Sequence, residues 1–131
     1  MIKNNNQIQS GFSKNLQCRV FCLPHAGEMI EKLEKKDAKI AKNIRKTITR
    51  IQKNPKIGKV LHANLANLQS LASRDKKIRV IFHYSNYYHR VLIWAVGPRK
   101  SVYSKLDLYL KEIENNPKLQ EQIKLQVGAA V

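Results

Sequence analysis

The longest uninterrupted apolar run of the chain, Val91 to Val96, reads Val-Leu-Ile-Trp-Ala-Val. Successive side chains of a strand point to opposite faces, so a run that is apolar at every position predicts a strand buried on both faces, in the middle of a sheet. Ile78 to Tyr84 predicts a strand before it, and Ser85-Asn86-Tyr87 predicts the turn between them. The later strand is expected to span Tyr88 to Val96, and Gly97-Pro98 to end it.

The first half of the chain changes from a strand pattern to a helix pattern. Leu16 to Leu23 has β-branched and aromatic residues at alternating positions and stops at Pro24, which predicts a first strand. From Ala26 to Lys53, apolar residues recur at helical spacing with Lys and Arg opposite, which predicts two helices packed on a core. We expect Asp37 to cap the second helix and Asn54-Pro55 to end it.

The order of these elements predicts an α+β fold. An N-terminal strand and a helical hairpin are followed by strands joined through turns, which is typical of an antiparallel meander. Lys56 to Ser73 is interpreted as a connector, and Ser101 to Leu110 as either a short strand or a final short helix. We divide the chain into a flexible polar leader (1–15), one folded domain (16–115) and a C-terminal tail or helix (116–131).

The charge of the chain is strongly unbalanced. Its formal net charge is +16, and Asp75 is the only acidic residue between Ala38 and Leu106. Such an excess indicates a polyanionic partner, with nucleic acid as the first choice and a merely solvated lysine-rich surface as the alternative. Neither a membrane-spanning run nor a signal-peptide core is evident, so we expect a cytoplasmic protein that does not act at a membrane.

Most metabolic enzyme classes lack support in the sequence. It contains no phosphate-binding glycine loop, no dinucleotide fingerprint, no nucleophile elbow and no clustered pair of carboxylates. Cys18 and Cys22 do not have the spacing of a zinc knuckle or a redox pair, and we interpret them as buried thiols in a reducing compartment. We expect neither a metal nor a cofactor.

The residues that remain near the predicted strands are cationic and aromatic. Guanidinium groups bind phosphate oxygens, and tyrosine rings offer faces on which unpaired bases stack, so the set suits single-stranded RNA. An alternative is an acid and base pair formed by His83 and His89 across one hairpin. The cationic and aromatic residues are Arg74, Lys76, Lys77, Arg79, Arg90, Arg99, Lys100, Tyr84, Tyr87, Tyr88 and Tyr103.

Two sequence blocks resemble a known family. After the Asn-Pro end of the hairpin and a leucine-bearing connector come Lys-Ile-Arg-Val-Ile-Phe (77–82) and, beyond a turn, Ile-Trp-Ala-Val-Gly-Pro-Arg-Lys-Ser-Val-Tyr (93–103). In this order the blocks are similar to the RelE/ParE superfamily of type II toxins, over residues 16–110. The resemblance implies a small antiparallel sheet on which a helical hairpin packs.

The resemblance also implies an activity. Its ribosome-dependent members enter the ribosomal A site and promote attack of a ribose 2′-hydroxyl on the neighbouring phosphate of messenger RNA. Arg79 matches the arginine that neutralises the scissile phosphate, Arg99 the one that stabilises or protonates the leaving oxygen, and Tyr103 the tyrosine that stacks on a base or assists proton transfer. The expected partners are a cognate antitoxin, the ribosome and messenger RNA, with RNA contacts from Arg74, Lys76, Lys77 and Lys100.

One departure from the family pattern keeps other functions open. The best-studied branch has two lysines in the strand before the Arg-Val block, where this chain has Ser70 and Ala72. Arg74, Lys76 or Lys77 in a shifted register would be substitutes. The alternatives are a gyrase inhibitor of the ParE branch, which Tyr103 disfavours, and an RNA-binding homologue without cleavage activity.

Overall fold

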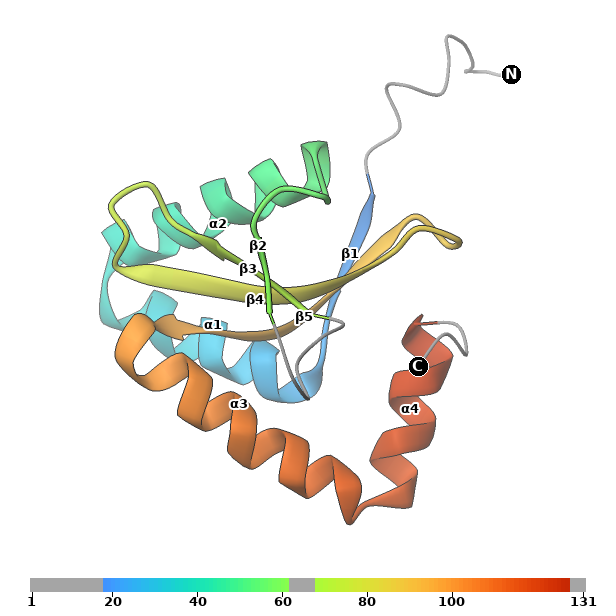
Figure 1. Cartoon of the computed structure of the whole chain (residues 1–131). Helices are drawn as coiled ribbons and strands as arrows, with labels where there is room; N and C mark the ends of the chain where they lie inside the picture. Colours follow the sequence, from blue (N-terminus) through green and yellow to red (C-terminus); the bar gives the residue numbers. More distant parts are fainter. Residues whose placement is uncertain (1–17, 62–67, 128–131) are drawn as a thin grey trace, which may run out of the picture.

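The computed structural model describes residues 18–61 and 68–127, which form a five-stranded sheet and four helices (Figure 1). Along the sheet the strands are ordered β1-β5-β4-β3-β2. The strands are β1 (Arg19–Cys22), β2 (Lys59–Val60), β3 (Gln69–Ala72), β4 (Ile78–Ser85) and β5 (Arg90–Pro98). The helices are α1 (Pro24–Lys36), α2 (Ala38–Lys53), α3 (Arg99–Glu114) and α4 (Pro117–Val127).

The helical hairpin agrees with the sequence prediction. Asp37 ends α1 and caps α2, because its carboxylate accepts a hydrogen bond of 2.8 Å from the backbone N–H of Lys39. Asn54 is the C-cap of α2, directly before Pro55. The expected boundaries of the hairpin are thereby confirmed, except that α1 already begins at Pro24, a residue that suits the first turn of a helix because it lacks an N–H.

The strand β5 lies inside the sheet, between β1 and β4, as its apolar run predicts. It pairs antiparallel with β4, and the register shifts at Ile81 and Phe82, which pair with Ala95 and Ile93. Trp94 is the extra residue of this β-bulge. Trp94 and Ala95 consequently belong to the same side of the core, while their neighbours Ile93 and Val96 belong to the other.

The α+β prediction is confirmed, but the sheet is mixed. β1 pairs parallel with β5, in a register that joins Val20 to Val91 and Cys22 to Ile93. An antiparallel meander accounts only for β2 to β5. The α1–α2 hairpin and the three strands that follow lie between β1 and β5 in the chain, and that length gives room for the crossover that a parallel pairing needs.

Two predicted boundaries were wrong. The connector from Lys56 to Ser73 contains β2 and β3, two short strands that lack an apolar repeat long enough to be noticed. The turn after β4 continues to His89, which has a positive φ of 51°, so β5 begins at Arg90 and not at Tyr88. β5 ends at Pro98, and the segment after it is the helix α3 of 16 residues, which is the helical one of the two alternatives predicted for it.

The sheet carries a hydrophobic core on each face. On one face, Ile44 and Ile51 of α2 pack with Val80, Phe82 and Ile93. The core of the other face joins Ile81, Leu92 and Trp94 to α3, which contributes Val102, Leu106 and Tyr109. Helices therefore cover both faces of the sheet (Figure 1).

The end of the chain is helical as far as it is described. α4 covers residues 117–127 and follows α3 after a short break at Asn115 and Asn116. The predicted leader 1–15 and the start of the predicted first strand lie outside the described residues, as do residues 62–67 and 128–131.

Candidate functional site

Three polar side chains meet at the margin of the α3 face. The hydroxyl oxygen of Ser70 lies 3.1 Å from the phenol oxygen of Tyr103, and Nη1 of Arg79 donates to the same serine oxygen at 3.3 Å. Ser70 is 1% exposed, while Arg79 and Tyr103 are half-buried. We call Ser70, Arg79 and Tyr103 the Ser70 cluster.

The sheet register creates the Ser70 cluster. β3 pairs with β4 so that Ala72 lies opposite Arg79 and Ser70 opposite Ile81. Side chains two residues apart on a strand share a face, so Ser70, Ala72 and Arg79 all point toward α3. Of the two positions at which the family resemblance expects lysines, Ala72 thus lies directly opposite Arg79, and Ser70, diagonally opposite, contacts it.

Gly58 supports the strand under this cluster. Its φ is +104°, a conformation that side chains rarely adopt, and a Cβ built there would lie 2.8 Å from the backbone oxygen of Ser70. Glycine is therefore required at this position for two reasons, backbone conformation and the close approach to β3.

Arg99 and Tyr103 reach the same corner from α3. Gly97 pairs with Arg79 across β4 and β5, and Arg99 is the first residue of α3, two residues later. Tyr103 follows Arg99 by four residues, and this spacing puts both on one side of the helix. The Arg99 side chain is exposed.

The predicted RNA-contacting residues lie around the same end of the sheet. Arg74, Lys76 and Lys77 are exposed in the turn between β3 and β4, where Lys76 has a positive φ of 64°. Lys100 is exposed in the first turn of α3. These cations are close to the cluster along the chain, but only Arg79 and Tyr103 are fixed by hydrogen bonds to Ser70.

The other predicted aromatic residues lie at the opposite end of the sheet. Ser85 follows Arg79 by six positions along β4, which corresponds to about 20 Å. Beyond Ser85, the rings of Tyr87 and Tyr88 contact each other edge to face, and the guanidinium of Arg90 lies 4.8 Å from the Tyr88 ring centroid. The cationic and aromatic set named from the sequence is therefore divided between two ends of the molecule.

The proposed histidine pair does not share a face. Nδ1 of His89 lies 3.0 Å from the phenol oxygen of Tyr84, so His89 is on the Tyr84 side of the hairpin. His83, the neighbour of Tyr84 in β4, points to the opposite face, where burial lowers its pKa. The arrangement does not support an acid and base pair made of these two residues.

The prediction that both cysteines are buried thiols agrees in part with the structure. Cys18 is buried, and its sulfur lies 3.6 Å from the ring of His89, whereas Cys22 is half-buried. Burial raises the pKa of both thiols, which disfavours the reactive thiolate. Within residues 18–61 and 68–127, no group of three or more His, Cys, Asp or Glu side chains has the arrangement of a metal site.

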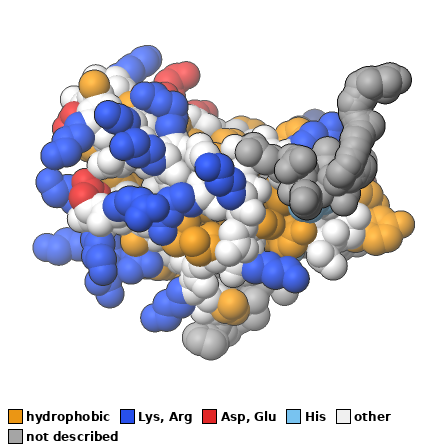
Figure 2. Space-filling model, turned by 90° about the horizontal axis from the view of Figure 1, so that it is seen from above, with side chains coloured by type: hydrophobic (Ala, Val, Ile, Leu, Met, Phe, Trp, Pro, Cys, Tyr) orange, Lys and Arg blue, Asp and Glu red, His pale blue; other side chains and the backbone are white. Residues whose placement is uncertain are grey.

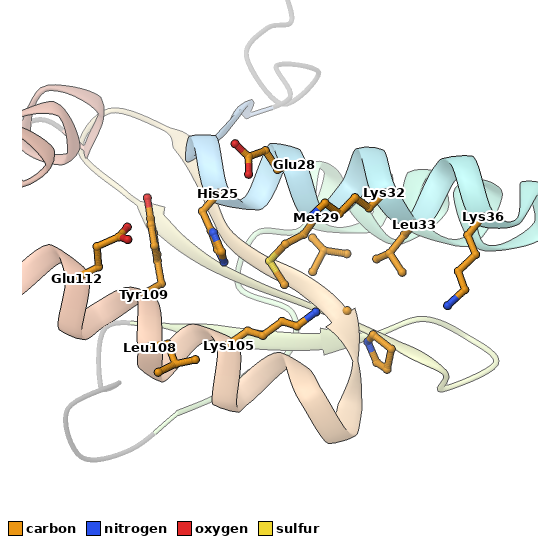
Figure 3. Close-up of a pocket in the computed structure, with 13 residues that line it drawn as sticks. His25, Glu28, Met29, Lys32, Leu33, Lys36, Lys105, Leu108, Tyr109 and Glu112 are labelled. Carbon is orange, nitrogen blue, oxygen red and sulfur yellow. The ribbon is translucent and has the colours of Figure 1, made fainter.

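A cavity of about 440 Å³ between α1 and α3 has no counterpart in the sequence prediction (Figure 3). The rings of His25 and Tyr109 stack on its wall with centroids 4.6 Å apart. Burial raises the pKa of Tyr109, and the nearby carboxylates of Glu112 and Glu28 raise it further. His25 and Tyr109 come from two helices whose sequences have an ordinary amphipathic pattern, so no local motif predicts that they meet.

No helix in the described part of the chain is both long and apolar enough to cross a membrane.

Comparisons with known proteins agree on the fold. No protein-family model matches the sequence, and no curated protein matches it. Solved structures do: the toxin-antitoxin complex RelBE2 from Mycobacterium tuberculosis has 21% identity and a TM-score of 0.53, with 64% of this chain and 100% of that chain covered. The chain has the fold of the RelE and ParE toxins.

Further matches extend this fold assignment. The isolated E. coli RelE toxin matches with 16% identity and a TM-score of 0.53, over 71% of this chain and 98% of that chain. A YoeB/ParE toxin from Agrobacterium tumefaciens has the same identity and TM-score, over 62% and 98%. The predicted RelE-like fold is confirmed. Because RelE and ParE structures both match, the fold by itself does not choose between their activities.

Proposed function

We propose that this protein is the toxin of a type II toxin-antitoxin system and cleaves messenger RNA on the ribosome. The observation that carries the proposal is the Ser70 cluster, in which an arginine and a tyrosine are held by one buried hydroxyl at a margin of the sheet ringed by cations. Its place and composition fit a reaction in which negative charge builds up on a phosphate.

The reaction forms a bond between the 2′-oxygen and phosphorus and breaks the bond from phosphorus to the 5′-oxygen. The guanidinium of Arg79 neutralises the charge that grows on the phosphate oxygens. Arg99, on the exposed first turn of α3, stabilises the leaving 5′-oxygen. Tyr103 stacks on a base or carries a proton between the two oxygens.

The cluster lacks a strong base, and this shapes the mechanism. A serine hydroxyl and an alanine stand where lysines would otherwise accept the 2′-proton, and the substitutes considered from the sequence lie in the exposed turn between β3 and β4. The proposed rate enhancement therefore comes from positioning and from electrostatic stabilisation by arginine. Ser70 acts as a positioning residue that fixes Arg79 and Tyr103 relative to each other.

An antitoxin is the proposed protein partner. A chain with a net charge of +16 gains from an acidic or amphipathic segment laid along the helical hairpin and over the arginines. Co-expression with the product of a small neighbouring reading frame tests this directly: a stable complex that suppresses cleavage is expected, and unchanged toxicity would contradict it.

The decisive experiment is primer extension on a defined messenger RNA in purified translating ribosomes. The wild-type protein is expected to cut in the A-site codon. Arg79→Ala and Arg99→Ala are each expected to lower the rate by about 100-fold or more, the range seen when one stabilising donor is removed. Tyr103→Phe keeps the ring and is expected to cost less if stacking dominates, and a similar amount if the hydroxyl moves a proton.

A ParE-like activity is the competing candidate, because a ParDE system from P. aeruginosa also shares the fold, with 11% identity and a TM-score of 0.50. Against it stands Tyr103, which the gyrase-directed members generally lack. A DNA supercoiling assay separates the two candidates: inhibition of gyrase together with intact messenger RNA would exclude the nuclease proposal.

A further inference from the structure

A second cationic surface lies on the other face of the sheet, beside α2. Figure 2 views the molecule from the α2 side and shows Lys and Arg side chains gathered there, with few acidic ones between them. A cavity of about 420 Å³ opens within this surface. Its lining, which we call the α2 groove, consists of Lys42, Arg45, Lys46, Thr49, Arg50 and Arg74.

The helix sets the spacing of these cations. The five residues from α2 follow one another at intervals of three or four positions or are direct neighbours, so they occupy one side of the helix. From Lys42 to Arg50 this side extends about 12 Å. Lys42, Arg45 and Lys46 are exposed, so their positive charges are available to a partner along this side of the helix.

Two contacts fix the far wall of the groove. Nη1 of Arg50 donates a hydrogen bond of 3.2 Å to the backbone oxygen of Ala72, and Nδ2 of Asn43 donates one of 2.8 Å to the carboxylate of Asp75. Both contacts attach α2 to β3 or to the turn that follows it. The exposed side chain of Arg74 in that turn thereby faces the cations of α2.

The carboxylates near the groove do not neutralise it. Asp75 accepts hydrogen bonds from Asn43, from the Ser73 hydroxyl at 2.6 Å and from the backbone of Lys77, and it remains a single negative charge beside the five cations of the lining. Glu34 lies 3.8 Å from Arg45 in a solvent-exposed contact, which screens one cation weakly.

We propose that the α2 groove binds the phosphate backbone of folded RNA. This inference rests on the proposed function, and it adds a second contact surface to the face that carries no part of the Ser70 cluster. An acidic antitoxin segment laid along the hairpin would cover this surface in the inactive complex. In the free toxin the lining, five cations and a threonine without an apolar residue, favours phosphates over a protein segment, which would need apolar anchors. No aromatic ring lines the groove, so it is expected to read phosphate charge and not bases.

The test measures binding without cleavage. A fluorescently labelled RNA hairpin is titrated with the full-length protein over a series of salt concentrations. The variant Lys42→Gln, Arg45→Gln, Lys46→Gln removes three exposed cations of the groove. The matched control, Lys105→Gln, Lys111→Gln, Lys118→Gln, removes the same charge from exposed positions on α3 and α4. Circular dichroism verifies that both variants are folded.

The groove variant is expected to bind at least tenfold more weakly than the wild-type protein at low salt. Its slope of log affinity against log salt should fall by about 2 to 3, because each phosphate contact contributes about one counterion. The control should lose much less. Equal losses in the two variants would overturn the proposal, since only net charge would then matter.

Two further arms separate the outcomes. If poly-glutamate of matched charge binds as well as the hairpin and loses as much in the groove variant, the surface recognises an acidic protein and the RNA assignment is wrong. Arg79→Ala should lose cleavage on ribosomes but keep hairpin binding. If the wild-type protein cleaves nothing, the proposed nuclease activity is wrong. The comparison of RNA binding by the groove and control variants still tests whether the α2 groove binds RNA.

Discussion

The two faces of the sheet hold their polar groups in opposite ways. On the α3 face, the Ser70 cluster is small, partly buried and joined by hydrogen bonds of 3.1 and 3.3 Å. On the α2 face, the α2 groove consists of cations of which most are exposed, arranged by the helix and not by contacts with one another. The proposed function of the Ser70 cluster therefore depends on geometry, and that of the α2 groove on the number of charges.

This difference predicts how each surface responds to change. A buried hydrogen-bonded group loses its function when the backbone beneath it moves by a fraction of an ångström. A field of exposed cations tolerates such movement but weakens in proportion to lost charge and added salt. Substitutions that act on one face and spare the other therefore test whether the two surfaces are independent.

The largest effect on the α3 face is expected from Gly58→Ala. The new Cβ would meet the backbone oxygen of Ser70 at 2.8 Å, and alanine is strained at a φ of +104°. We expect a loss of about 2 kcal/mol or more in the free energy of unfolding, measured by urea denaturation, because neither the backbone oxygen nor the dihedral angle can yield cheaply. Messenger RNA cleavage should fall as well, while the folded fraction should still bind the RNA hairpin through the α2 groove.

Gly27→Ala is the matched control for this substitution. Gly27 lies inside α1, and a Cβ added there meets nothing within 4 Å. Because alanine favours a helix over glycine by up to about 1 kcal/mol, this variant should be slightly more stable than the wild-type protein. Equal destabilisation by both substitutions would mean that the close approach of Gly58 to β3 is not what matters.

A smaller effect is expected from Ser70→Ala, which removes the oxygen shared by Tyr103 and Arg79. The free energy of unfolding should fall by about 1 to 2 kcal/mol, since two part-buried partners lose one hydrogen bond each. Under the proposed function, the single-turnover cleavage rate should fall about tenfold at saturating protein, with ribosome affinity unchanged. Ser70→Thr keeps the hydroxyl and should restore part of the rate.

Ser104→Ala provides the comparison for Ser70→Ala. The Ser104 hydroxyl is exposed on α3 and donates only to the backbone oxygen of Ser101. Its removal should change neither stability nor rate measurably. A cleavage rate that is unaffected by Ser70→Ala would show that Arg79 and Tyr103 do not need this positioning contact.

The sequence predicted the elements that depend on short-range patterns, but it did not predict which distant strands pair with each other. The apolar run of β5, the cap at Asp37 and the helical hairpin follow from short-range patterns, and all three are confirmed. The parallel pairing of β1 with β5 joins segments that are distant in the chain, and no short-range sequence pattern indicates it. β2 has only two residues, too few for any periodic signal to appear.

The site shows the same limit. Arg79, Arg99 and Tyr103 were named through a family resemblance, which supplied their roles but not their neighbours. Ser70 was noted only as a missing lysine, and its contact with both Arg79 and Tyr103 depends on the register of β3 against β4 and on the packing of α3. The basic side of α2 was visible as a pattern, but Arg74 joins it only through the fold.

The smallest expected effect concerns Asp75, which belongs to the α2 face. The hydrogen bond from the Ser73 hydroxyl, followed by that from the backbone N–H of Lys77, lowers the pKa of Asp75. A carboxyl whose pKa is lowered by folding stabilises the protein above its unfolded pKa of about 3.9, and this contribution is lost as the pH falls through the folded value. Asp75→Asn should therefore lower the urea midpoint at pH 7.

The pH dependence separates this charge effect from a simple packing change. The difference in urea midpoint between the wild-type protein and Asp75→Asn should narrow as the pH falls below about 3.9, where the wild-type carboxyl also becomes neutral. A difference that stays constant from pH 7 to pH 3 would contradict the role of the ionised carboxylate. Because Asp75 fixes the turn that carries Arg74, this variant also acts on the α2 groove: the lost negative charge would strengthen RNA binding there, whereas a loosened turn would weaken it. The hydrogen bonds of the Ser70 cluster should stay in place in either case.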